Sequence, residues 1–168
     1  METGEELRFD RGGETPARLE RQLARLAGMT AAQMGRVSRE ALRAAGAHKD
    51  HFVVLAVLAE FGPASQATLS DRTSVYKSDL VAVLNDLEGG GWVRRAPDPA
   101  DKRRNVITIT GLGERRLAEL DRILDGVNEH IMGPLDHDER AQLFALLNRV
   151  NAHLATEDGG GPTGSRAP

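Results

Sequence analysis

The chain has 168 residues, of which 40% are hydrophobic and 28% charged, a composition typical of a globular protein. It contains no cysteine, which excludes disulfides, cysteine zinc sites and thiol redox sensing, and which fits a cytoplasmic protein. No apolar run is long enough to span a bilayer, and the polar start is unlike a signal peptide. The net charge of -3 argues mildly against a nucleic-acid partner.

The N-terminal third predicts a disordered start and a long helix. Residues 1–13 are polar and are expected to be disordered. Residues 16–45 predict one helix, with Thr15 as its cap and Pro16 in its first position. Its apolar stripe is uneven and includes Leu19, Leu23, Leu26, Met34, Val37 and Leu42. Such a helix is too long to find its partner within one small domain, so it needs the other terminus or a second copy.

Residues 51–61 are apolar on nearly all sides, which predicts a helix buried on several faces. The polar residues at its start, His48, Asp50 and His51, have a spacing that could ligate zinc. Polar residues at a helix start are the commoner explanation, so we predict no metal site and no cofactor. The same neighbourhood is the expected wall of a small-molecule pocket, and its ligand-binding candidates are Met34, His48, His51, Phe52 and His130.

The segment from residue 65 to 110 predicts a helix, a turn, a second helix and a two-stranded hairpin. The first helix covers about 66–72, with Ser65 as its cap. The second begins near Tyr76, and its buried face is predicted by the helical spacing of Leu80, Val83, Leu84 and Leu87. Three glycines at 89–91 end it, and strands follow from Trp92 and over 105–110. This order is that of a winged helix-turn-helix.

The hairpin between the two strands is rich in cations, namely Arg94, Arg95, Lys102, Arg103 and Arg104 against Asp98 and Asp101. An arginine at such a tip can enter the minor groove, and the first turn of the second helix can meet base edges in the major groove. The DNA-binding candidates are Ser65, Gln66, Tyr76, Lys77, Ser78, Asp79, Arg94, Asp101, Lys102, Arg103 and Arg104.

The run DPADKRRNVITIT resembles the wing signature of MarR-type transcriptional regulators, and SQATLSDRTSVYKSDLVAVLNDLEGGGWV resembles their helix-turn-helix. The resemblance covers about 16–154 and implies that Asp101 and Arg103 take the family's Asp-x-Arg wing roles. It also implies dimerisation through the terminal helices and, frequently, phenolic or aromatic acids as effectors. Two positions depart from the pattern: Ala82 stands where many relatives have arginine, and Asp79 stands where serine or threonine is common. Asp79 could accept from a cytosine amine or pair with Lys77 or Arg103.

Two further helices complete the chain. Residues 112–132 carry Leu117, Leu120, Leu124, Val127 and Ile131 at helical spacing, after Thr110 as the expected cap. Asp136 and Glu139 predict a capping box that opens a last helix through Leu154. The tail at 156–168 is of low complexity and is expected to be disordered.

The predicted fold is mainly α with a small β-wing, made of a winged helix-turn-helix domain at about 50–111 and long N- and C-terminal dimerisation helices at about 16–45 and 112–155. These parts form one regulator domain over 14–155. The apolar stripes of the terminal helices predict a homodimer, because leaving them in water is costly at ~25 cal/mol per Å². A two-fold dimer would place its recognition helices about 34 Å apart, on successive major grooves.

The predicted function is that of a sequence-specific transcriptional regulator, a ligand-responsive repressor that binds a palindromic operator in double-stranded DNA. No phosphate loop or nucleophile elbow is present in the sequence, so we do not expect an enzyme. The alternative is a dimeric winged-helix adaptor for protein interactions without specific DNA binding. Such an adaptor has no need for clustered cations on its wing.

Overall fold

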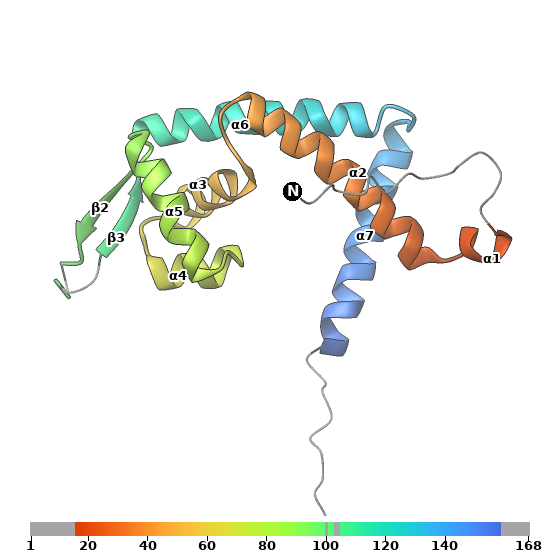
Figure 1. The fold of residues 1–168 in the computed structure, drawn as a ribbon, viewed down its shortest axis with the longest axis horizontal. Helices are drawn as coiled ribbons and strands as arrows, with labels where there is room; N and C mark the ends of the chain where they lie inside the picture. The colour runs from red at the N-terminus through yellow and green to blue at the C-terminus, as the bar shows by residue number, and fades with distance from the viewer. Residues whose placement is uncertain (1–15, 100, 103–104, 159–168) are drawn as a thin grey trace, which may run out of the picture. The chain divides into compact units, whose positions relative to one another are not determined.

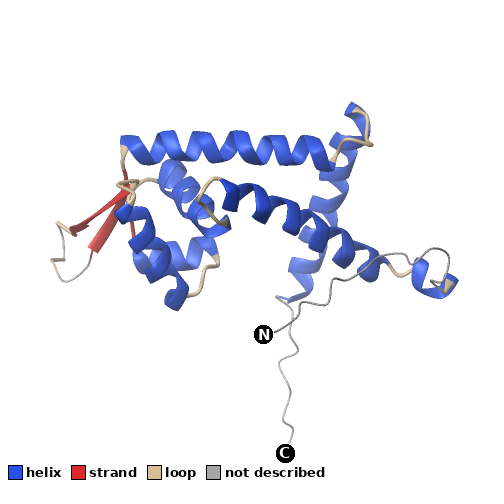
Figure 2. Cartoon of the chain, turned by 45° about the horizontal axis from the view of Figure 1, so that its top comes forward, coloured by secondary structure: helices blue, strands red, loops and turns tan. Residues whose placement is uncertain are grey.

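The computed structural model describes residues 16–99, 101–102 and 105–158 (Figure 1). The chain divides into two compact units, Met1–Val127 and Asn128–Pro168. The described residues are mainly helical, and their strands form one small sheet (Figure 2). The predicted fold class is therefore confirmed. None of the helices in these residues is long and apolar enough to cross a lipid bilayer.

The helix-turn-helix consists of α4 (Gln66–Thr73) and α5 (Lys77–Gly89). Ser65 caps α4 as predicted, since its Oγ accepts a hydrogen bond of 3.2 Å from the backbone N–H of Thr68. The turn passes through Ser74, whose φ of 55° is left-handed. Val75, the next residue, is buried, and its carbonyl accepts a hydrogen bond from the Ser70 hydroxyl. These contacts fix the angle at which α5 leaves the turn.

The sheet has three antiparallel strands in the order β1-β3-β2, namely β1 (Ala64–Ser65), β2 (Val93–Pro97) and β3 (Asn105–Ile109). The hairpin of β2 and β3 was predicted, and it projects beyond α5 (Figure 1). The short strand β1 was not predicted. It pairs Ala64 with Ile107 and Ser65 with Val106, and two residues are too few to show the alternation that identifies a strand.

The core of the first unit lies between α3 (Lys49–Phe61), the helix-turn-helix, the sheet and α6 (Gly111–Ile131). The predicted inner face of α5 is confirmed, because Leu80, Leu84 and Leu87 are fully buried and Val83 is 4% exposed. The largest buried side chains from the other elements are Val54, Leu55, Leu58, Leu69, Ile107 and Leu120.

The N-terminal segment differs from the single helix predicted over 16–45. It forms α1 (Ala17–Glu20) and α2 (Leu23–Ala44), with Gln22 in an extended conformation between them. Pro16 precedes the first helical residue, so its predicted position inside the helix is wrong. Every residue over 16–24 is exposed, and without packing a helix of this length is marginal in water. Thr15, the predicted cap, lies outside the described residues.

Both predicted caps of the C-terminal helices are confirmed. The backbone N–H of Gly113 donates to Thr110 Oγ1 at 3.1 Å at the start of α6. Asp136 and Glu139 form a reciprocal capping box, with both bonds at 2.9 Å, before α7 (His137–Asp158). The helix α7 includes residues 156–158, which were expected to belong to a disordered tail. The rest of that tail and residues 1–13 lie outside the described part of the chain.

Candidate nucleic-acid interface

The start of α5 is presented to solvent. Tyr76, the residue before its first turn, is 79% exposed, and Lys77, Ser78 and Asp79 are exposed as well. The opposite face of the helix holds it in the core, as described above. An open hollow of about 550 Å³ adjoins this turn and is lined by Ser70, Ser74, Val75, Tyr76, Lys77 and Ser78. The fold thus exposes one end of a rigidly anchored helix.

Asp79 accepts a hydrogen bond of 3.1 Å from the Ser78 hydroxyl. Within the described residues it forms no ion pair with Lys77, so the pairing that the sequence suggested between these two is absent. Arg103, the other suggested partner, lies outside the described residues. Ala82 is exposed one turn further along the same helix.

Ser65 and Gln66 are half-buried at the start of α4. The Ser65 hydroxyl already serves the helix, because it caps the Thr68 N–H and also lies 2.9 Å from Thr68 Oγ1. Its first role is therefore to hold α4, and its contact with DNA stays a prediction.

Arg95 joins the wing to the recognition helix. Its guanidinium donates a hydrogen bond of 2.8 Å to Asn85 Oδ1, and its Nη1 lies 3.5 Å from Glu88 Oε2. Its backbone N–H also donates to Glu88 Oε1 at 3.2 Å. The charge cluster in the sequence did not indicate this internal role. The alternation of a strand was the available signal, since it points neighbouring Arg94 and Arg95 to opposite faces.

The DNA-binding candidates of the wing that the structure describes are exposed to solvent. Arg94 is exposed on β2, and Asp101 and Lys102 are exposed at the hairpin. Arg103 and Arg104, which the sequence predicts to be DNA-binding residues, lie outside the described residues.

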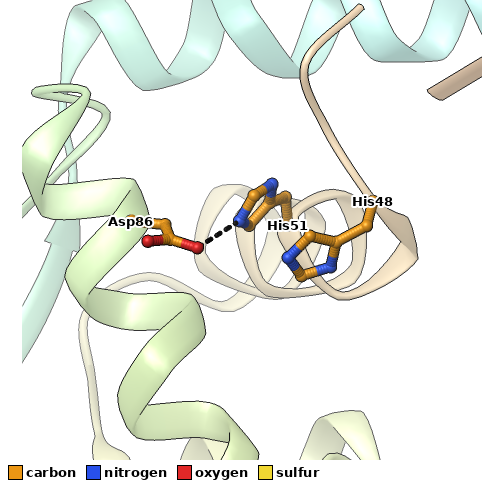
Figure 3. A group of neighbouring side chains, drawn as sticks. All are labelled: His48, His51 and Asp86. Atoms are coloured by element: carbon orange, nitrogen blue, oxygen red, sulfur yellow. Dashed lines mark ion pairs between the residues drawn. The ribbon is translucent and has the colours of Figure 1, made fainter. Parts of the chain in front are cut away.

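A second cluster lies between α3 and α5, where His48, His51 and Asp86 come together (Figure 3). His51 Nε2 is 3.6 Å from Asp86 Oδ2, and the two imidazole rings have their centroids 3.6 Å apart. Burial and then the neighbouring His48 lower the pKa of His51, and Asp86 opposes them. The sequence indicated the two histidines, but not Asp86, which comes from another helix.

The candidate effector residues are dispersed. Met34 on α2 and Phe52 on α3 are half-buried, and His130 is exposed near the end of α6, in the second unit. A pocket of about 510 Å³ adjoins the end of α2 and is lined by Arg36, Arg39, Glu40, Arg43, Ala47 and His48. Of the five candidates, all of which the structure describes, His48 lines this pocket and the other four do not.

The helix-turn-helix buries its inner face, its second helix starts in solvent, and a β-hairpin follows it. These three features together define a winged-helix protein. Its relatives agree. The profile of the MarR family matches residues 47–104. The chain is 32% identical over 102 residues to the transcriptional regulator HosA of Escherichia coli O111:H-, covering 61% of this chain and 76% of HosA. It is 30% identical over 99 residues to the repressor NicR of Pseudomonas putida, covering 59% of this chain and 63% of NicR.

Solved structures show the same fold. The apo form of MarR from E. coli superposes with a TM-score of 0.69 at 27% identity, over 77% of this chain and 96% of that protein. A mutant form of the same MarR in complex with operator DNA superposes with a TM-score of 0.64, also at 27% identity, over 76% of this chain and 92% of that protein. The chain belongs to the MarR family. Members of this family are DNA-binding transcriptional regulators, so the expectation that the protein is not an enzyme is confirmed.

Proposed function

We propose that this protein is a repressor that binds an inverted-repeat operator as a homodimer. The observation that supports this most directly is the presentation of α5. Its start is exposed at Tyr76, Lys77 and Ser78, while its opposite face is buried in the core. A recognition helix needs this combination, because base edges are read only by side chains held in a fixed register.

The wing supplies the second contact in this proposal. Arg94 and Lys102 are exposed on the hairpin and would contact phosphates. Arg103, by its place in the wing signature, would enter the minor groove. The attachment of Arg95 to α5 supports a joint approach of the two elements, since the base of the wing cannot turn without disturbing that contact.

The terminal helices would form the dimer. Large apolar side chains are exposed on α1 and α2, and a further set is exposed on α7, comprising Phe144, Leu146, Leu147, Val150 and Leu154. Several large apolar side chains exposed on one helix are more typical of an interaction site than of a free surface. A second copy would cover it and pair two recognition helices for two half-sites.

The effector would be an aromatic or phenolic acid bound beside α2. The pocket there, of about 510 Å³, is within the usual range of small-molecule sites. Three arginines and His48 line it, and guanidinium groups suit a carboxylate because they can donate two parallel hydrogen bonds to it.

Selection of bound DNA from a random duplex pool tests the proposal. We expect enrichment of an inverted repeat whose half-sites are one helical turn apart, followed by release when benzoates or hydroxybenzoates are added. Failure to enrich any sequence at low salt would contradict specific DNA binding. Enrichment of a single half-site would contradict the dimer alone.

A further inference from the structure

We propose that His48, His51 and Asp86 form a binding site for a divalent transition metal of the zinc type. The site lies between α3 and the recognition helix α5 (Figure 3). This proposal goes beyond the proposed function, which involves no metal. The two can be tested separately, because metal binding can be measured without DNA.

The spacing of the three side chains suits chelation. One possible ligand atom from each lies within 4.8 Å of the others, and His51 Nε2 is 3.6 Å from Asp86 Oδ2. Tetrahedral zinc with bonds of about 2.1 Å places its ligand atoms about 3.4 Å apart. The His51–Asp86 pair is therefore near that separation already.

His48 supplies the movable ligand. It is the exposed residue before the first turn of α3, and its ring lies against that of His51, tilted by 35°, with centroids 3.6 Å apart. Two imidazoles on one metal have centroids about 5 Å apart. The His48 ring would therefore turn away from the His51 ring and direct a nitrogen at the metal, and the exposure of His48 leaves room for this movement.

His51 provides an independent reason for a ligand. The residue is 6% exposed, yet neither of its ring nitrogens has a hydrogen-bond partner among the described residues. At 3.6 Å the Asp86 carboxylate is too distant for a good hydrogen bond. Unpaired buried nitrogens are rare because their contact with water is lost without replacement, and a bound ion can replace it. A metal at Nε2 would supply a missing partner.

The surrounding charges favour a cation. Asp50 Oδ2 is 3.9 Å from His48 Nδ1, and a carboxylate behind a ligating histidine orients its ring. Arg116 is the opposing charge near His51. Its own charge is partly offset by Glu119 at 2.8 Å, and its guanidinium also donates to the Ala45 carbonyl.

The donor set predicts which metals bind. Two imidazoles and one carboxylate favour zinc, cobalt or nickel over magnesium and calcium, which prefer oxygen ligands alone. Three protein ligands would leave the fourth tetrahedral position to water.

Isothermal titration of the untagged, full-length, chelator-treated protein with zinc chloride tests this site. We expect one zinc per chain. Asp86→Asn and His48→Gln should each weaken binding at least about ten-fold, and both positions are exposed enough for the variants to fold. His137→Gln, at the exposed start of α7, is the matched control and should bind as the wild type does.

Cobalt gives a second readout, because tetrahedral cobalt absorbs strongly in the visible range. The wild type should show this band, and Asp86→Asn should lose it. Zinc should also raise the melting temperature of the wild type more than that of Asp86→Asn, since a ligand of the folded state stabilises it. The proposal would be overturned if Asp86→Asn and His48→Gln bound zinc as tightly as the wild type, or if the wild type showed no preference for zinc over magnesium. A gel shift in the presence of chelator would still report DNA binding separately.

Discussion

The winged core, from α3 to α6, and the outer helices α1, α2 and α7 differ in how far they bury their large apolar side chains. All the largest fully buried side chains come from α3, α4, α5, β3 and α6. In contrast, α1, α2 and α7 leave leucines such as Leu23 at 71% exposure and Leu154 at 52%. One region thus completes a core within a single chain. The other leaves large apolar side chains exposed, which a second copy would cover in our proposal.

The largest expected effect comes from Gly113, where the core leaves no room for an added side-chain atom. A Cβ on Gly113 would lie 2.0 Å from the Trp92 carbonyl oxygen and 2.7 Å from Ile109 Cγ1. Gly113→Ala should therefore lower the free energy of unfolding by about 3 kcal/mol, since backbone cannot yield as a side-chain end can. Urea denaturation measures this change.

Gly126→Ala on the same helix is the matched control. A Cβ there has nothing within 4 Å, so this variant should be as stable as the wild type or more stable by up to about 1 kcal/mol. Equal loss of stability in both variants would mean that α6 is sensitive to any substitution and that the contact at Trp92 is not the cause.

A polar substitution on α7 should weaken dimer assembly more than it destabilises the fold of one chain. Leu147 is 48% exposed on α7. If a dimer covers it, Leu147→Glu buries a charge and should raise the dimer dissociation constant at least about 100-fold, or about 2.7 kcal/mol. Analytical ultracentrifugation measures this constant. An unchanged dimer would remove α7 from the interface.

DNA binding should be more sensitive to the wing tip than to cations elsewhere. Arg103→Ala should lower operator affinity more than about ten-fold, which corresponds to about 1.4 kcal/mol, because a minor-groove contact is lost. Gel shifts measure the affinity, and circular dichroism checks that the fold is retained. Arg122→Ala, an exposed cation on α6, should bind normally, and equal losses in both variants would indicate a general charge effect.

The smallest expected effect concerns Lys102, which is exposed on the hairpin. Lys102→Ala should flatten the log-log dependence of affinity on salt by about one unit if one phosphate contact is lost. Titrations at several salt concentrations measure the slope, with Lys49→Ala as a lysine control. A slope in Lys102→Ala equal to that of the wild type would mean that Lys102 does not touch phosphate.

Much of the core could be predicted from the sequence because local signals and packing agree there. The spacing of Leu80, Val83, Leu84 and Leu87 predicted the inner face of α5, and all four are buried. The caps at Ser65 and Thr110 were equally clear, since each is a hydroxyl that precedes a helical pattern and accepts from its first turn.

Features that depend on distant partners were not predictable. The break at Gln22 has no proline or glycine to announce it, and it occurs where every neighbouring residue is exposed. Asp86 approaches His51 from another helix, and Arg95 reaches Asn85 and Glu88 across the base of the hairpin. Periodicity describes which side of an element is apolar, but it does not say which polar groups meet once elements pack.

The attachment of Arg95 to Asn85 and Glu88 has a consequence for protein engineering. If the first turn of α5 and the hairpin both contact the operator, as we propose, grafting them from different donors should transfer specificity only when Arg95, Asn85 and Glu88 are transferred together. A chimera that replaced Asn85 and Glu88 would keep the exposed start of α5 and the hairpin but lose the contacts that join them.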